Sequence, residues 1–273
     1  MTDSTASHLL FEKRNGIAYV TLNRPEKRNA FSPEMIVRLV DVWREVAADA
    51  SVRVVLLSGA GSQAFSSGGD LGSTIPLMMR TRPPVGEWEE RLAADRKLLY
   101  AAILRDASFF KPVVAAINGH ALAGGAEMIL STDIRVMSSE ATIGVTEVRR
   151  GLIAGGGSLV RLARQIPWAQ AMELTLVGEP IAAAQALQIG LVNRVVPRGE
   201  VLSVAEDLAR RISLGAPIAL AKTKEAIVRS SGRPIEEGFA IEAACTKENA
   251  RTEDAREGPR AFMEKRPAVF KGR

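Results

Sequence analysis

Short apolar runs alternate with helix-spaced apolar positions along the first two-thirds of the chain. Residues 16–22 are rich in β-forming side chains and predict a strand. After a polar loop, Ser32 can cap a helix whose first position is Pro33. The apolar positions that follow recur at helical spacing: Ile36, Leu39, Val40, Trp43 and Val46. A second apolar run, residues 52–57, predicts another strand, so the pattern begins as strand, helix, strand.

This alternation continues to about residue 197 and then stops. The further strands and extended segments predicted are 65–71, 113–117, 133–137, 141–147 and 192–196. The further helices predicted are 88–110, 159–165, 169–176 and 182–188, with 72–87 as an irregular surface loop. The only elements predicted beyond Pro197 are helices, over 200–214, 218–230, 235–249 and 254–264. We therefore expect a flexible tail at 1–9, an α/β core at 10–197 and an all-helical region at 198–273.

Composition narrows the class of protein. The 273 residues are 47% hydrophobic and 25% charged, which is ordinary for a globular protein. The net charge of +5 suits an anionic small ligand or nucleic acid, but no Lys/Arg run is interleaved with aromatic residues. We therefore expect no nucleic acid partner. A single cysteine, Cys245, no apolar run of membrane-spanning length and no signal-peptide pattern predict a cytoplasmic protein without a membrane segment.

Several kinds of catalytic site are excluded by the residues present. The only histidines are His8 and His120, and there is no Gly-x-Ser-x-Gly motif for a hydrolase nucleophile. No Cys/His cluster has metal-ligand spacing, so we expect no metal. The phosphate-binding loop of nucleotide hydrolases is absent as well.

Two glycine turns and two glutamates remain as candidate chemistry. Gly124 and Gly125 follow a buried strand and lead into an apolar segment that can continue as a helix. Backbone N–H groups there stand at the positive end of a helix dipole, with Glu127 about one turn further on. The alternative is a tight turn with Glu127 in an ordinary ion pair. A second turn, at Ser67 and Gly68, also offers N–H groups.

Together these groups suit one kind of chemistry. Two N–H donors can hold one oxyanion, as enzymes do for an enolate or a tetrahedral adduct. Two carboxylates, Glu127 and Glu147, can divide acid and base roles if their environments separate their pKa values.

Five motifs in order resemble the crotonase, or enoyl-CoA hydratase/isomerase, superfamily. They are Asn-Arg-Pro at 23–25, Phe-Ser-Ser-Gly-Gly-Asp-Leu at 65–71, Asn-Gly-His-Ala-Leu-Ala-Gly-Gly-Ala-Glu at 118–127, Gly-Val-Thr-Glu at 144–147 and Lys-Arg-Pro at 265–267. Each motif alone is weak, and five in this order are specific. The resemblance covers the chain from about residue 10 to its end.

The resemblance implies an α/β fold, a crotonase-like spiral of strand–strand–helix units followed by an all-helical C-terminal trimerisation region. It implies a homotrimer or a hexamer built as a dimer of trimers. The implied ligand is an acyl-CoA thioester, with coenzyme A as part of the substrate and no separate cofactor. The implied activity is that of a hydratase-type lyase of fatty acid metabolism, which hydrates a 2-enoyl-CoA to the 3-hydroxyacyl-CoA or catalyses the reverse dehydration.

The resemblance also assigns residues to roles. The backbone N–H groups of Ser67 and Gly124 would form the oxyanion hole. Glu127 would activate water and Glu147 would return a proton to the α-carbon, and their separation of 20 residues matches the hydratase pattern. The coenzyme A contacts implied are Lys27, Arg28, Ser66, Gly68, Asp70, Leu71, Phe262 and Lys265. Of these, the tail residues Phe262 and Lys265 would reach a neighbouring subunit's ligand.

Departures from the pattern leave alternatives open. Val145 and Thr146 stand where fatty-acid hydratases have Gln-Pro, and either Arg149 or Arg150 could pair with Glu147 and lower its pKa. An enoyl-CoA isomerase or an acyl-CoA hydrolase could use the same scaffold. A non-catalytic protein that binds acyl-CoA or RNA is the alternative from another class. The presence of both glutamates favours the hydratase, because a pure binder has no need of them.

Overall fold

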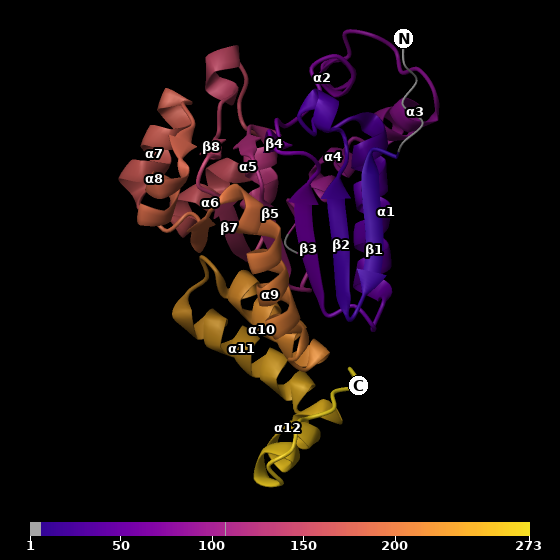
Figure 1. Ribbon diagram of the computed structural model, residues 1–273, viewed down its shortest axis with the longest axis vertical. Coiled ribbons are helices and arrows are strands. Elements are labelled where there is room, and N and C mark those ends of the chain that lie inside the picture. Colours follow the sequence, from indigo (N-terminus) through magenta and orange to yellow (C-terminus); the bar gives the residue numbers. More distant parts are fainter. Residues whose placement is uncertain (1–6, 107) are drawn as a thin grey trace.

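The computed structural model describes residues 7–106 and 108–273 (Figure 1). Residues 1–6 of the expected tail therefore lie outside the described residues. The rest of that expectation is wrong, because His8 bonds to Ser32 and the first strand, β1 (Leu9–Arg14), begins at the buried Leu9.

A six-stranded main sheet forms the centre of the protein. Its strand order is β1-β2-β3-β5-β7-β10, and β1 pairs with β2 in antiparallel fashion while the other neighbours are parallel. Besides β1 the strands are β2 (Ile17–Leu22), β3 (Val54–Gly59), β5 (Val113–Ile117), β7 (Ile134–Ser138) and β10 (Arg194–Val196). All five residues of β5 are buried, as expected of a parallel strand covered on both faces.

A second, four-stranded sheet has the order β4-β6-β8-β9. Its strands are β4 (Ala64–Ser66), β6 (His120–Leu122), β8 (Thr142–Gly144) and β9 (Ile181–Ala182). Since β4, β6 and β8 each follow a strand of the main sheet directly, the chain passes repeatedly from one sheet to the other before it enters a helix. This repeat is the strand–strand–helix spiral that the sequence resemblance implied, and the implied fold is confirmed.

Helix α1 (Pro33–Ala48) is built as the sequence predicts. The Ser32 hydroxyl accepts a hydrogen bond from the N–H of Met35 at 3.2 Å, and Pro33 occupies the first helical position. The apolar stripe is buried, and the indole N–H of Trp43 donates to the carbonyl of Ala102 at 2.8 Å. This bond ties α1 to the helices that cover it.

The region predicted as one long helix is divided in two. Helices α3 (Glu87–Ala94) and α4 (Lys97–Ala102) are separated at Asp95, whose backbone is extended and whose carboxylate accepts from the N–H of Lys97 at 3.0 Å. Aspartate favours such a local side-chain bond over continuation of the helix. The preceding segment is also more regular than predicted, because it contains α2 (Thr74–Met78).

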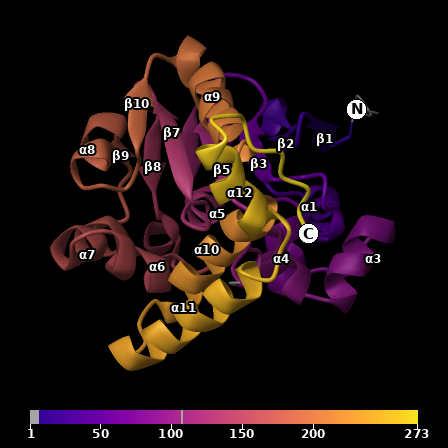
Figure 2. The ribbon, with the colours of Figure 1, turned by 90° about the horizontal axis from the view of Figure 1, so that it is seen from below.

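The remaining helices surround the two sheets. They are α5 (Gly124–Ile129), α6 (Ser158–Gln165), α7 (Trp168–Val177), α8 (Ala183–Gln188) and α9 (Val201–Ser213), with short 3-10 turns at Pro25–Lys27, Glu147–Arg150 and Arg198–Glu200. Helix α9 packs on β3, β5 and β7, and buries Val201, Ala205 and Ala209. Figure 2 shows α3 and α7 on opposite sides of the molecule.

The last three helices extend away from the α/β body (Figure 1). They are α10 (Pro217–Ser230), α11 (Ile235–Asn249) and α12 (Asp254–Met263). In the described part of the chain, no helix combines the length and apolar character that crossing a membrane requires.

A buried arginine joins α5 to the main sheet. Arg135 on β7 is only 7% exposed, and its guanidinium donates to the carbonyls of Ile129, Leu191 and Thr132 at 2.8–3.0 Å. It therefore satisfies the carbonyl of Ile129 at the end of α5, that of Thr132 just beyond this helix and that of Leu191 after α8. Burial lowers the pKa of Arg135 to about 10, so the guanidinium stays charged at neutral pH.

We expect replacement of Arg135 by methionine to destabilise the protein by about 3 kcal/mol, because several buried carbonyls lose their donor. The melting temperature should fall by roughly 6–12 °C in a thermal unfolding measurement. Arg164→Met is the matched control, since the Arg164 guanidinium donates to a carbonyl of its own helix at the surface. Equal melting temperatures for the two variants would contradict this role of Arg135.

Candidate active site

A cavity of about 610 Å³ is lined by residues from all the candidate segments. Ser67, Gly124, Glu127 and Glu147 all line it, although they are spread over 81 positions of the chain. The structure thus brings both glycine turns and both glutamates to one place. In the described part of the chain, no group of three or more His, Cys, Asp or Glu side chains is arranged to hold a metal ion.

The predicted N–H donor at Ser67 is already engaged. Its N–H donates to the carbonyl of Arg28 at 3.0 Å, so it is not available to an oxyanion, and this assignment is wrong. Within the described residues, the N–H groups of Gly69 and Gly124 have no hydrogen-bond acceptor, and both residues line the cavity. Gly124 is the first residue of α5, where an N–H has no partner in the helix.

A short bridge to Phe31 sets the direction of the Gly69 N–H. The N–H of Phe31 donates to the carbonyl of Gly68 at 2.8 Å, and the N–H of Asp70 donates to the carbonyl of Phe31 at 3.1 Å. In such a parallel bridge the residue between the two partners turns its own N–H to the other side. Gly69 therefore directs its N–H away from Phe31.

Two predicted coenzyme A contacts instead hold these turns together. Gly68 has φ +88°, and a Cβ atom there would lie 2.7 Å from the nitrogen of Gly124, so only glycine allows the turns to touch. Ser66 is fully buried, and its hydroxyl donates to the carbonyl of Asn29 at 2.8 Å. Neither residue lines the cavity. We therefore correct their assignment from ligand contacts to positioning residues.

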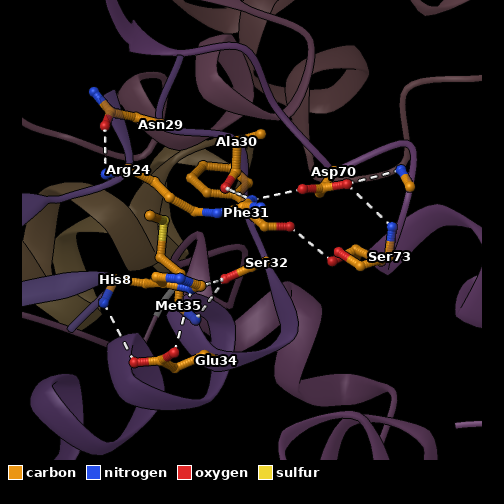
Figure 3. A network of polar contacts seen from close by, with 12 residues as sticks. His8, Arg24, Asn29, Ala30, Phe31, Ser32, Glu34, Met35, Asp70 and Ser73 are labelled. Carbon is orange, nitrogen blue, oxygen red and sulfur yellow. Dashed lines mark hydrogen bonds and ion pairs between the residues drawn. The ribbon is translucent and has the colours of Figure 1, made fainter. Parts of the chain in front are cut away.

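Asp70 anchors the loop that follows it through several polar contacts (Figure 3). Its carboxylate pairs with Arg24 at 2.5 Å and accepts from the N–H groups of Gly72 and Ser73 at 2.7 and 3.0 Å. Burial acts to raise the pKa of Asp70, but these three donors together lower it. Although Asp70 lines the cavity, its carboxylate serves the protein itself and fixes the loop that carries Arg28.

Other predicted coenzyme A contacts divide into two groups. Lys27, Arg28 and Leu71 line the cavity, and Leu71 is exposed. Phe262 and Lys265 do not line it and lie at the end of the helical extension. Their contact with a neighbouring subunit's ligand stays a prediction.

Glu127 is buried and firmly held. One carboxylate oxygen accepts from the N–H of Gly156 at 2.7 Å and from the hydroxyl of Ser158 at 2.9 Å. Burial raises the pKa of Glu127, while the bonds from Ser158 and Gly156 oppose the rise. The sequence analysis missed both donors. The only available signal was the Gly-Gly-Gly-Ser run at 155–158, which looks like an ordinary helix start.

Glu147 has a different environment. It begins the 3-10 turn Glu147–Arg150, and within the described residues one of its buried carboxylate oxygens has no hydrogen-bond partner. Burial, together with the nearby charge of Glu127, raises the pKa of Glu147 to about 7. The predicted ion pairs are not formed, because Arg149 bonds to Val177 and Glu179 and Arg150 bonds to Thr146.

Comparison with known proteins shows the family of the chain. The sequence model of the enoyl-CoA hydratase/isomerase family matches residues 12–273. The chain belongs to the enoyl-CoA hydratase/isomerase family. It is 38% identical to (E)-benzylidenesuccinyl-CoA hydratase of Thauera aromatica, over 96% of this chain and 98% of that protein.

Two further relatives extend the comparison. An enoyl-CoA hydratase of Mycobacterium tuberculosis is 38% identical, over 97% of this chain and 96% of that protein. The crystal structure of an enoyl-CoA hydratase from Bacillus anthracis superposes with a TM-score of 0.87 at 32% identity, and covers 97% of this chain and 100% of that one. The similarity thus extends over nearly the whole chain and includes the helical extension.

The raised pKa of Glu147 predicts a pH-dependent stability. The folded protein keeps the Glu147 proton up to a pH of about 7, whereas an unfolded glutamate releases it near 4.5. Stability should therefore fall as the pH rises through this window. Glu147→Gln cannot ionise, so its melting temperature relative to the wild type should be higher at pH 8 than at pH 5.

The matched control is Glu173→Gln, at an exposed position on α7. Its melting temperature should follow that of the wild type at both pH values. A Glu147→Gln variant that behaves like this control would show that Glu147 ionises freely in the folded protein.

Proposed function

We propose that this protein hydrates a 2-enoyl-CoA thioester to the 3-hydroxyacyl-CoA, or catalyses the reverse dehydration. One observation carries the proposal. The unengaged N–H groups of Gly69 and Gly124 line the same cavity as two carboxyl groups, Glu127 and Glu147, whose pKa values are raised. The names of the hydratases to which the chain is similar support the same reaction.

The geometry suggests how the hydration proceeds. The thioester carbonyl accepts hydrogen bonds from Gly69 and Gly124, which makes C3 of the enoyl group electrophilic. Water attacks C3 as Glu127 takes its proton, and the π electrons move towards the carbonyl oxygen as an enolate. Glu147, protonated through its raised pKa, then delivers a proton to C2. Proton exchange between the two carboxyl groups and solvent restores the starting state, so the pair titrates as one unit.

The coenzyme A portion of the substrate would occupy the mouth of the cavity. Lys27 and Arg28 line this mouth and provide positive charge for phosphate groups. The Arg24–Asp70 ion pair holds their loop in place, so the cationic side chains are presented without being neutralised by Asp70. We propose no cofactor apart from the coenzyme A that the substrate itself carries.

The helical extension supports a trimer or hexamer as the working form. Ile227, Ile235, Phe239 and Phe262 on α10–α12 are each more than 60% exposed in the single chain. Apolar side chains exposed in this number on projecting helices are typical of a surface that another subunit covers. The cytoplasm is the compartment that we propose, consistent with one unpaired cysteine, Cys245.

The direct test is an assay with crotonyl-CoA and a series of longer 2-enoyl-CoAs. Hydration removes the conjugated absorbance and gives the 3-hydroxyacyl-CoA. An isomerase would move the double bond without adding water, and a hydrolase would release free coenzyme A. Acyl-CoA binding without turnover of any substrate in the series would contradict the proposal.

We expect Glu147→Gln to lower kcat by about 10²- to 10⁴-fold, the usual contribution of a general acid or base. Affinity for butyryl-CoA, which has no double bond to hydrate, should be nearly unchanged, because glutamine keeps the shape of the side chain. Steady-state kinetics and calorimetric titration measure the two effects separately. Unaltered turnover would remove Glu147 from the reaction, and Glu173→Gln again serves as the control.

Hydration should also depend on pH in a defined direction. Because Glu147 must carry a proton to deliver it to C2, kcat/KM should fall by about tenfold per pH unit above pH 7. The residual activity of Glu147→Gln should lack this fall. A wild-type rate that stays flat or rises between pH 7 and pH 9 would show that Glu147 is not the proton donor.

A further inference from the structure

A second cavity adjoins the first. It has a volume of about 450 Å³ and lies among the turn that begins at Glu147, helix α6 and helix α7. Three residues line both cavities, so the two adjoin at the turn that begins at Glu147: Glu147, Leu152 and Ile153. Figure 1 shows α6 and α7 on the side of the molecule opposite α2 and α3.

The lining of the second cavity is mainly apolar. It includes the buried side chains of Val145, Ala154 and Leu162, together with exposed apolar side chains such as Trp168 and Leu176. Thr175, one of its two polar lining residues, donates its hydroxyl to the carbonyl of Ala171 at 2.8 Å. Among the described residues that line this cavity, Glu147 is the one with a buried side-chain oxygen that has no hydrogen-bond partner. Such a cavity favours a hydrocarbon group.

The position of the reacting atoms decides which group could enter it. Hydration requires C3 of the enoyl group to face both Glu127 and Glu147. The substituent on C3, which is the rest of the acyl chain, then begins beside Glu147, which also lines the second cavity. On the other side of the first cavity, Ile75 of α2 lies against Gly69 and therefore flanks the carbonyl instead.

We propose that the second cavity binds the distal part of the acyl group, and that the protein acts on enoyl-CoA thioesters with a medium-length alkyl or an aryl substituent on C3. An apolar cavity of ~150 Å³ already holds a benzene ring, so about 450 Å³ leaves ample room. This inference rests on the proposed function and specifies its substrate class. It assigns a specificity role to Leu162, Ala163, Met172 and Leu176.

The test fills this cavity and measures the effect of chain length. Ala163 lines the cavity from an exposed position on α6, so Ala163→Phe adds a ring there with little effect on the core. Leu176→Trp fills it from α7 and gives a second, independent variant. The matched control is Ala169→Phe, which adds the same ring at an exposed position of α7 that does not line the cavity. Met79→Trp narrows the opposite side of the first cavity.

Binding of saturated acyl-CoAs from four to ten carbons is measured by calorimetry, and hydration is measured with the matching 2-enoyl-CoAs and with cinnamoyl-CoA. In the wild type each buried methylene should tighten binding by about fourfold until the cavity is filled. In the wild type, affinity should therefore increase from the four-carbon to the ten-carbon acyl-CoA. Ala163→Phe and Leu176→Trp should each make this increase in affinity smaller by at least about tenfold. Both variants should lower kcat/KM for decenoyl-CoA and cinnamoyl-CoA far more than for crotonyl-CoA. In Ala169→Phe, the ratios of kcat/KM between these substrates should remain those of the wild type.

The results separate this inference from the proposed function. The inference would be overturned, even if hydration occurs, by a wild-type affinity that does not rise with chain length. It would also be overturned if Ala163→Phe and Leu176→Trp kept the wild-type increase in affinity with chain length. A selective loss of long-chain binding in Met79→Trp alone would overturn it as well and place the acyl group beside α2. If saturated acyl-CoAs bind with the expected chain-length gain but no enoyl-CoA is hydrated, the acyl site stands and the hydration proposal fails.

Discussion

The arrangement of the site depends on the contact between two turns, at Gly68 and Gly124. A side chain at Gly68 would reach the nitrogen of Gly124, and a Cβ atom on Gly125 would collide with the carbonyl of Ser66. Glycine at these positions lets two backbones meet that belong to different strand–strand–helix units. The N–H groups of Gly69 and Gly124 can therefore face one cavity, and no flexible side chain has to be ordered to place them.

The two carboxyl groups opposite these N–H groups differ in how they are held. Glu127 is fixed by donors from Gly156 and Ser158, whereas a buried oxygen of Glu147 has no partner among the described residues. Burial raises the pKa of both, and the charge of Glu127 raises that of Glu147 further. Because the surroundings of the two groups differ, the proton can reside mainly on Glu147 while Glu127 is ionised. This difference allows one group to act as base and the other as acid.

The sequence predicted most of the fold because the parallel strands are buried on both faces and appear as continuous apolar runs, as in β3 and β5. The edge strand β1 was missed, since its second half is polar and exposed. Within the site, the assignment of an N–H donor to Ser67 failed for a tertiary reason. The direction of each N–H depends on bonds to Arg28 and Phe31, in a loop more than 35 residues away, and no local pattern records them.

The ends of the short strands explain why such distant residues converge. Strands β4, β6 and β8 run parallel, with Ala121 of β6 paired to Ser66 on one side and to Ile143 on the other. The carboxyl ends of parallel strands meet at one edge of a sheet, and Gly69, Gly124 and Glu147 each follow such an end by two or three residues. A shift of one residue in this register would move a donor or a carboxyl group to the other face. The main sheet opposes that shift, because β4, β6 and β8 are each joined directly to one of its strands that is paired on both sides.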